Sequence, residues 1–434
     1  MRFLILAVML FAGCNKTNPN FCEGAELDNC TLVDGPPGGQ DCEKSADCPD
    51  NAAPVCDLDR DMPVCVPCTG QEIGACTDTT PVCNDATNTC VACTVHADCP
   101  DSLACLPDGA CADPLTVAYV SNTGEATEAA CAKATPCKTL GKALMAGKAI
   151  IKIDATTISE PLPATLSSNL TILADPGATI DRIGDGPAIL ATAGTSQIFD
   201  LTITGSSGAV GIGVGVSMPS TSTANLTLKR MAVHTNASLG IQADAGQLTI
   251  SQSKIFLNAG GAIRISQSRF DISNTWIFEN GGPGLNANGG VTLIQTNDDP
   301  RRFEFNTVAS NSNGRNNGIS GVECAVVDMG VTFASNIIFG NTTGTGTPIQ
   351  VGGDSDCAFE FSNIGPQNAG GTMNFVEDPL FVEPGVMNDY HLMAGSPAID
   401  KAKPGSTVTD DIDGEATRPT GSGDLRDVGA DERP

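Results

Sequence analysis

Two aspartates and two arginines lie close together in this chain, at Asp298, Asp299, Arg301 and Arg302. Carboxylates can bind calcium, and a nearby basic side chain can remove a proton that the metal acidifies. These four residues are therefore the best catalytic candidates in the sequence. The segment around them is polar throughout, which is typical of a solvated loop tip. We interpret the four residues as such a tip and keep catalysis as the alternative.

A second group of carboxylates alternates with other residues at Asp57, Asp59 and Asp61, as at the start of a calcium-binding loop. The segment lacks the glycine and the distal glutamate of an EF-hand. Between residues 15 and 113 the chain carries 18 acidic and three basic residues. We interpret this region as a solvated acidic stalk, with calcium as the alternative, and expect no other cofactor.

Nineteen cysteines indicate an oxidising compartment, because cytosolic thiols are kept reduced. Most of them form three successive units of four, and only His96 accompanies them, so disulfides explain the spacing better than zinc. We predict six disulfides here and leave their connectivity open. The units are Cys42, Cys48, Cys56 and Cys65; Cys68, Cys76, Cys83 and Cys90; and Cys93, Cys99, Cys105 and Cys111. Further disulfide candidates are Cys22 with Cys30, Cys131 with Cys137, and Cys324 with Cys357.

The first 14 residues resemble the signal and lipobox of bacterial lipoproteins. Residues 3–11 are apolar but too short to span a bilayer, and Ala12-Gly13-Cys14 places small residues before a cysteine. The resemblance implies that Cys14 becomes a lipidated N-terminus and that Asn15 sorts the protein to the outer membrane. Phe11 stands where the family usually has leucine, and an ordinary secretory signal is the alternative.

A 22-residue period runs through the middle of the chain. Within each copy, apolar and polar residues alternate, which is the period of a strand. A fixed period of this size predicts a parallel β-helix, in which we expect the asparagine column to be structural. The columns are Leu226, Leu248 and Phe270; Leu228, Ile250 and Ile272; Val233, Ile255 and Ile277; Asn236, Asn258 and Asn280; and Ile241, Ile263 and Leu285.

Composition divides the chain into six parts. Residues 117–121 and 138–148 are expected to form a strand and a capping helix that protect the first coil. Residues 294–320 break the register and are expected to form a longer excursion. The net charge of −27 disfavours nucleic acid as a partner, and we expect a monomer. The parts are a lipoprotein signal (1–13), a tether (14–41), a Cys-rich repeat module (42–113), an N-terminal cap (114–148), a parallel β-helix (149–382) and a C-terminal cap or tail (383–434).

Both ends of the predicted solenoid carry a second resemblance. Tyr119-Val120-Ser121, Pro136-Cys137-Lys138 and Asp427-Val428-Gly429-Ala430-Asp431-Glu432 resemble secreted right-handed parallel β-helix proteins of the pectin-lyase-like superfamily. The resemblance covers residues 115–434, and the cysteine repeats resemble the stalks of myxobacterial surface proteins. It implies a right-handed β-helix. It implies no particular reaction, because this fold hosts lyases, hydrolases, isomerases and adhesins.

Enzymes of that superfamily place their catalytic groups on outward positions of neighbouring coils. Lyases use carboxylate-bound calcium with a Lys or Arg base, and hydrolases use aspartates with a His and an Arg-Ile-Lys motif. Here Arg264-Ile265-Ser266 ends in serine, and we expect neither His234 nor His391 to be catalytic. The outward columns are mostly neutral: Thr227, Thr249 and Asp271; Lys229, Ser251 and Ser273; and Gln242, Arg264 and Asn286.

These observations favour a non-enzymatic, lipid-anchored surface protein outside the cytoplasm. In this reading a Cys-rich stalk carries a β-helix rod that has a structural role or binds a polysaccharide or another surface protein. One alternative is a calcium-dependent, lyase-like enzyme that acts on polysaccharides through the cluster at 298–302. Another is a calcium-dependent adhesive module at 42–113.

Overall fold

The computed structural model describes residues 41–127, 130–208, 212–282, 288–295, 299–325, 330–353, 355–367, 370–385, 387–414, 418–419 and 425–433. These residues form two compact units. One holds the described residues up to Cys99 together with Cys105–Cys111, and the other holds Pro100–Ala104 and the described residues from Ala112 onward.

The first unit is held together by six disulfides. In each four-cysteine repeat the first cysteine pairs with the third and the second with the fourth, a connectivity that the sequence left open. Little apolar surface is buried, so the cross-links must supply most of the stability. The pairs are Cys42–Cys56, Cys48–Cys65, Cys68–Cys83, Cys76–Cys90, Cys93–Cys105 and Cys99–Cys111. The secondary structure is β1 (Val55–Asp57) with β2 (Val64–Val66), β3 (Val82–Asn84) with β4 (Thr89–Val91), and short 3-10 helices at Ser45–Asp47 and His96–Asp98.

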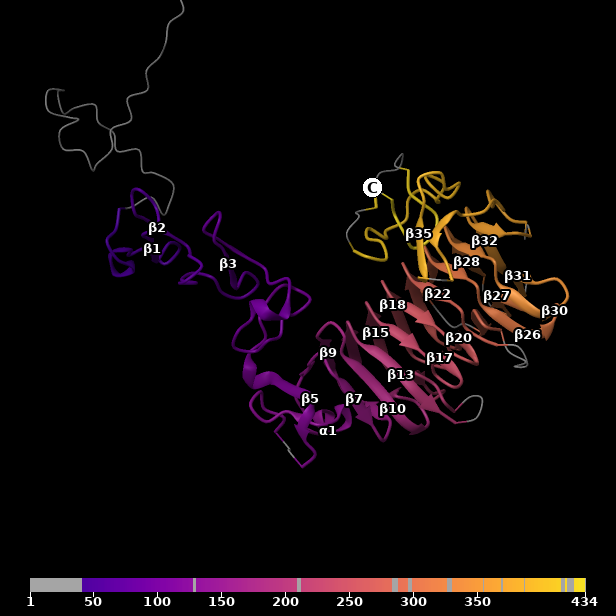
Figure 1. The fold of residues 1–434 in the computed structure, drawn as a ribbon, viewed down its shortest axis with the longest axis horizontal. Helices are drawn as coiled ribbons and strands as arrows, with labels where there is room; N and C mark the ends of the chain where they lie inside the picture. Colours follow the sequence, from indigo (N-terminus) through magenta and orange to yellow (C-terminus); the bar gives the residue numbers. More distant parts are fainter. Residues whose placement is uncertain are drawn as a thin grey trace, which may run out of the picture. The chain divides into compact units, whose positions relative to one another are not determined.

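The second unit is a β-helix of three parallel sheets, and with the disulfide-rich first unit it confirms the predicted fold class (Figure 1). The ten-stranded sheet contains β5 (Val117–Glu125), β6 (Ile150–Ile153), β9 (Leu170–Ala174), β12 (Thr195–Phe199), β15 (Asn225–Lys229), β18 (Gln247–Ser251), β21 (Arg269–Ser273), β24 (Arg301–Glu304), β28 (Val331–Ala334) and β32 (Cys357–Glu360). The nine-stranded sheet contains β7 (Thr157–Glu160), β10 (Thr179–Asp185), β13 (Thr202–Ser207), β16 (Ala232–His234), β19 (Lys254–Phe256), β22 (Trp276–Phe278), β25 (Thr307–Ala309), β29 (Ile337–Phe339) and β33 (Asn363–Gly365). The eight-stranded sheet contains β8 (Ala164–Leu166), β11 (Ile189–Ala191), β14 (Val216–Met218), β17 (Leu239–Ala243), β20 (Gly261–Ser266), β23 (Val291–Gln295), β27 (Ile319–Cys324) and β31 (Ile349–Gly353).

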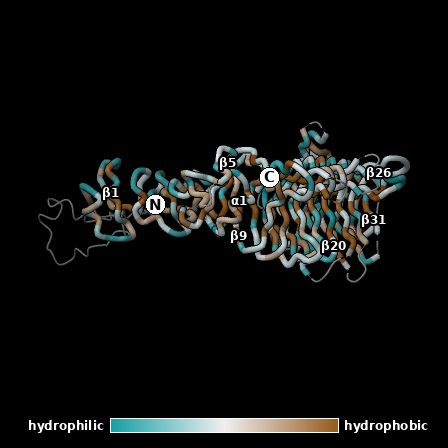
Figure 2. Tube along the Cα trace, turned by 90° about the horizontal axis from the view of Figure 1, so that it is seen from below, coloured by the Kyte–Doolittle hydropathy of each residue, from teal (hydrophilic) through white to brown (hydrophobic). Residues whose placement is uncertain are grey.

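The apolar columns of the sequence become the interior of these coils. Leu226, Leu248 and Phe270 are successive Cα partners and are almost completely buried. Apolar and polar segments therefore alternate around the coils, as Figure 2 shows. One column was extended wrongly, because the partner of Ile263 is Val291; Leu285 lies outside the described residues. The period fails there because the coil grows longer after β20.

The described residues between 294 and 320 form strands of the coils and not the predicted excursion. Strands β24 and β25 stack in register inside this segment, and Ile272 pairs with Phe303. The register broke in the sequence because the coil lengthens from 22 to 31 residues, as the steps along the asparagine column show. Part of the added chain forms an extra parallel pair, β26 (Ser312–Asn316) with β30 (Thr342–Thr345).

The asparagine column forms a buried ladder, as expected. The Asn236 Nδ2 donates to Asn258 Oδ1 at 2.8 Å, and Asn258 Nδ2 donates to Asn280 Oδ1 at 2.9 Å. The ladder continues through Asn311 to Asn341 at the same 2.9 Å distance. Each side chain also binds backbone groups of the corner in the preceding coil, as Asn258 does with Asn236 N and Val233 O.

A short helix closes the first coil. Helix α1 (Leu140–Met145) is shorter than the predicted span, and Thr139 caps it by accepting from Lys142 N at 3.2 Å. The buried Glu160 carboxylate accepts from Leu140 N at 2.8 Å, which places a negative charge at the helix N-terminus. The 3-10 helix Pro114–Thr116 precedes β5.

The tail packs on the outside of the later coils. Its hairpin, β34 (Phe381–Glu383) with β35 (Asp389–Leu392), belongs to a second apolar cluster that includes Trp276 and Phe278 of β22 (Figure 1). These two side chains point away from the solenoid interior, and the tail buries them to 2% exposure. The outer face of the nine-stranded sheet is thus covered over part of its length.

Candidate functional site

The structure describes three of the four catalytic candidates and places Arg301 and Arg302 on opposite faces of one strand. Asp298 lies outside the described residues, and Asp299 is exposed and pairs with Arg301 through an Nε–Oδ1 contact of 3.0 Å. Arg301 is the register partner of Phe270 and so occupies a position of the inward column. Its side chain is 10% exposed, and its buried Nη1 has no hydrogen-bond partner among the described residues. Arg301 is therefore poorly placed to act as a base on an external substrate.

Arg302 is on the opposite face of the same strand and donates three hydrogen bonds. Its Nε and Nη2 donate to the two oxygens of Asp271 at 2.7 and 2.8 Å, and its Nη1 donates to Thr407 of the tail at 2.9 Å. Burial lowers the pKa of Arg302, but the hydrogen bond and charge of Asp271 outweigh this and raise it overall. A guanidinium held in this way stays protonated and cannot accept a proton.

The interpretation of this segment as a loop tip is therefore wrong for Arg301 and Arg302, which lie on β24. Arg264, from the predicted outward column with Gln242 and Asn286, lies on a different sheet. It pairs with Asp244 at 2.9 Å, while Gln242 donates to the same carboxylate. Its register partner in the next coil is Thr292 and not Asn286, which lies outside the described residues.

The tail covers one outward column of the ten-stranded sheet. Lys229 lies 3.6 Å from a carboxylate oxygen of Asp410, and Glu304 accepts a hydrogen bond of 2.7 Å from the hydroxyl of Ser406. Further along the rod, Lys403 pairs with Glu360 at 2.7 Å. The segment 403–410 thus runs back along the coils and uses their outward charges as anchors.

Two other outward columns of that sheet form an open polar face. Its members lie on three strands of equal spacing, β15, β18 and β21, and they are exposed or half-buried. They offer hydroxyl, amide and charged groups at a spacing of roughly 4.8 Å between strands. We call this set the polar face: Asn225, Thr227, Gln247, Thr249, Arg269 and Asp271.

A buried ionic cluster around Arg418 and Glu432 stabilises the tail, and the sequence did not lead us to predict it. Arg418 has no exposed side-chain surface, pairs with Glu432 at 2.6 Å and lies over the ring of Phe305 at 4.2 Å. Burial raises the pKa of Glu432 to about 7, against the opposing effect of Arg418. The acidic residues between 427 and 432 could have indicated an ionic cluster. Arg418, which pairs with Glu432, lies outside that stretch of the sequence.

His391 and His234, which we expect not to be catalytic, both contact neighbouring side chains. His391 bridges Asp389 through Nδ1 at 2.5 Å and Asp413 through Nε2 at 2.6 Å. Burial lowers the pKa of His391, but these two hydrogen bonds and the nearby carboxylates raise it overall. The ring therefore links two carboxylates of the tail. His234 stacks on Phe256 at 4.6 Å, and burial lowers its pKa.

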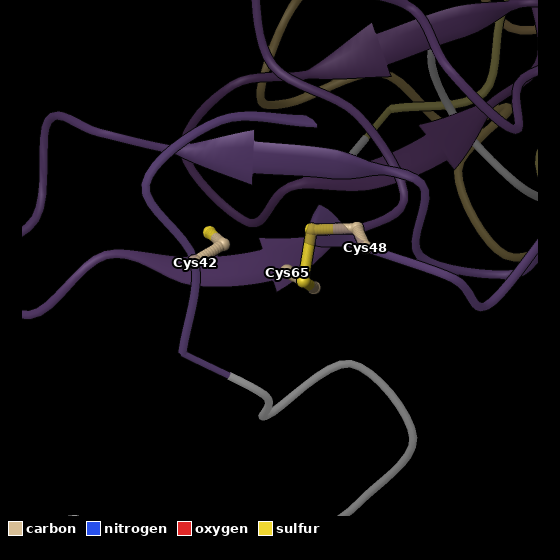
Figure 3. Close-up of side chains that lie close together, drawn as sticks. All are labelled: Cys42, Cys48 and Cys65. Carbon is tan, nitrogen blue, oxygen red and sulfur yellow. A yellow bond between two sulfur atoms is a disulfide. The ribbon is translucent and has the colours of Figure 1, made fainter. Parts of the chain in front are cut away.

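One of the three calcium candidates, Asp57, already has an ion-pair partner. Asp57 pairs with Arg60 at 2.7 Å and accepts from Asp59 N, while Asp59 and Asp61 are exposed. In the described part of the chain, the groups of three metal-binding side chains are cysteine triads, such as Cys42, Cys48 and Cys65 (Figure 3). All these sulfurs are in disulfides, so none of them is a thiolate that could bind zinc.

Two disulfides belong to the second unit. Cys131 pairs with Cys137 beside the capping helix, and Cys324 of β27 pairs with Cys357 of β32. Cys14, Cys22 and Cys30 lie outside the described residues. The eight disulfides indicate an exported protein. In the part of the chain that the structure describes, no helix has the length and apolarity needed to cross a bilayer.

The comparisons with known proteins add little to this geometry. No protein-family profile matches the chain, and no curated protein matches it. Among solved structures, the chain is similar to one titled "Crystal structure of pectate lyase Pel9A". The identity is 14%, the TM-score is 0.33, and the match covers 73% of this chain and 96% of the other. The fold is established by the strand register of the chain itself.

Proposed function

We propose that this protein is a non-enzymatic surface rod, anchored by lipid at Cys14, whose polar face binds a glycan. The observation that carries the proposal is the arrangement around Arg302. Its guanidinium donates two hydrogen bonds to Asp271 and one to Thr407 of the tail. The other residues of the polar face stay exposed or half-buried. Arg302 is thus committed to these partners, and the polar face offers hydrogen-bonding groups where a ligand could bind.

The polar face suits a sugar chain for chemical reasons. Its amides and hydroxyls both donate and accept hydrogen bonds, as sugar hydroxyls do. Arg269 is exposed, and a guanidinium can bind the carboxylate of an acidic sugar through two hydrogen bonds. The strands repeat regularly, so an extended polymer can meet equivalent groups on successive coils. We therefore favour an acidic polysaccharide as the ligand.

The test uses the full chain carrying Cys14→Ser, which removes the lipidated residue. Acidic and neutral polysaccharides are offered with calcium or with a chelator, and both retained binding and new unsaturated or reducing ends are measured. We expect binding without cleavage, and we expect the pair Gln247→Ala with Arg269→Ala to weaken it. Ser217→Ala on the eight-stranded sheet is the matched control and should leave binding unchanged.

Cleavage would favour the enzymatic alternative. If new ends appear, and if they disappear in Asp298→Ala or Arg301→Ala, the site lies at the cluster and the proposal fails. The anchor is tested separately by fractionation and metabolic labelling with a fatty acid. Cys14→Ser should then abolish labelling and release the protein from membranes, and unchanged labelling would contradict the assignment of Cys14.

A further inference from the structure

The outer face of the nine-stranded sheet carries a column of rings. His234, Phe256, Phe278, Ala309 and Phe339 are successive Cα partners on β16, β19, β22, β25 and β29. We call this the aromatic column. The first three rings stack face to face, with centroid distances of 4.6 and 4.9 Å. These distances match the spacing of strands in a sheet, roughly 4.8 Å.

Ala309 interrupts this column. It stands where a ring would otherwise lie between Phe278 and Phe339, which are separated by about twice the strand spacing. The tail fills part of the gap. Tyr390 lies 5.0 Å from Phe278, and Phe381 lies 5.1 Å from Tyr390. Both tail rings are buried, so this end of the gap is closed.

The rest of the gap is a pocket of about 290 Å³ that is open to solvent on one side. An apolar cavity of roughly 150 Å³ suffices to hold a benzene ring, so a substituted ring has room here. Gly340 contributes to the space, because no atom lies within 4 Å of the point where its Cβ would be. The lining residues are Ala309, Ser310, Phe339, Gly340, Asp378, Leu380, Phe381, Pro384 and Met393.

The lining is mostly apolar and has two polar side chains at its edge. Asp378 is exposed, and one of its carboxylate oxygens accepts from Leu380 N at 2.9 Å. Ser310 supplies a hydroxyl from the corner that follows β25. Leu380 and Met393 are 37% and 44% exposed, so apolar surface surrounds the opening. Binding sites for small molecules have this composition, with few polar groups fixing the orientation of an apolar body.

We propose that this pocket binds an aromatic ring that carries a positively charged amine. The ring would stack on Phe339 above Ala309 and restore the aromatic column. The amine would lie against the carboxylate of Asp378. A sugar fits less well, because two polar side chains cannot satisfy its many hydroxyls. The inference is independent of the proposed glycan site, which lies on a different sheet.

The test uses phenethylamine as the probe and the full chain carrying Cys14→Ser. Saturation-transfer NMR detects the ring protons of bound probe. Phenylacetate has the same ring but the opposite charge, and cyclohexylmethylamine has an amine but no aromatic ring. We expect phenethylamine to bind and both comparators to bind more weakly. No binding of phenethylamine, or equal binding of phenylacetate, would overturn the proposal.

Two variants locate the site. Ala309→Phe fills the gap with a ring of the chain itself and should abolish saturation transfer. Ala358→Phe adds the same ring at an exposed position of β32 and should bind the probe as the wild type does. Asp378→Asn should weaken phenethylamine about two- to fivefold, the range for an exposed ion pair. Thermal melts show whether the variants fold. If Ala309→Phe unfolds, unchanged affinity in Asp378→Asn still refutes the site.

Discussion

Replacing Asn280 with alanine should destabilise the β-helix strongly, because this side chain connects three coils. Its Nδ2 lies within 2.9 Å of Ile255 O, Phe278 O and Asn311 Oδ1. Its Oδ1 accepts from the backbone N and the Nδ2 of Asn258 at 3.1 and 2.9 Å. All these groups are buried, so water cannot replace the lost partner.

The magnitude follows from the number of groups left unsatisfied. A hydrogen bond contributes about 1 kcal/mol net, and a buried group without a partner costs about 1–3 kcal/mol. Some of the partners keep a second hydrogen bond, for example Asn258 Nδ2 with Val233 O. We therefore expect Asn280→Ala to lower the free energy of unfolding by about 3–5 kcal/mol.

Urea unfolding followed by tryptophan fluorescence measures this loss. Trp276 is the only tryptophan of the chain and is buried under the tail, so its emission reports this part of the solenoid. Asn122→Ala, at an exposed position of β5, is the control and should change stability by less than about 0.5 kcal/mol. A loss below about 1 kcal/mol for Asn280→Ala would show that the ladder is not an important source of stability.

Three further predictions concern the tail and the last coils. The pKa values of His391 and Glu432 are raised in the folded state, so their contribution is fully present at acidic pH and is lost as pH rises through neutrality. Melts at pH 5.5 and 8.5 should show higher stability at the lower pH, and a smaller difference in Glu432→Gln. Arg418→Met should cost about 3–5 kcal/mol in urea, because it leaves a buried carboxylate unpaired, and a cost below 1 kcal/mol would contradict this. Replacing Cys324 and Cys357 by serine should cost about 2–4 kcal/mol in the same assay, and an unchanged midpoint would contradict it.

The sequence predicted the fold where the coils have equal length. Between Leu226 and Phe270 each coil has 22 residues, so a fixed period aligns side chains that are partners in the sheet. The prediction failed beyond β20, where the coils become longer. The asparagines of these longer coils could have revealed the register. Asn306 and Asn311 have the same spacing as Asn336 and Asn341, and both pairs enter ladders of the solenoid.

The tail was harder to predict, because its partners are distant in the chain. Asn274 donates to Asp410 across 136 residues, and Gln252 donates to the carbonyl of Asp411 across 159. No local pattern encodes such contacts. These contacts form because Gln252 and Asn274 lie at corners of the coils and because the tail returns along the same side of the solenoid.

The catalytic candidates show why closeness in sequence is a poor guide in this fold. Successive side chains of a strand point to opposite faces of its sheet. Arg301 and Arg302 are neighbours in the chain, yet one takes an inward position and the other binds Asp271 outside. A convergent site on a β-helix must instead combine residues one coil apart. Asp271 and Arg302 have that relation, and they use it to neutralise each other.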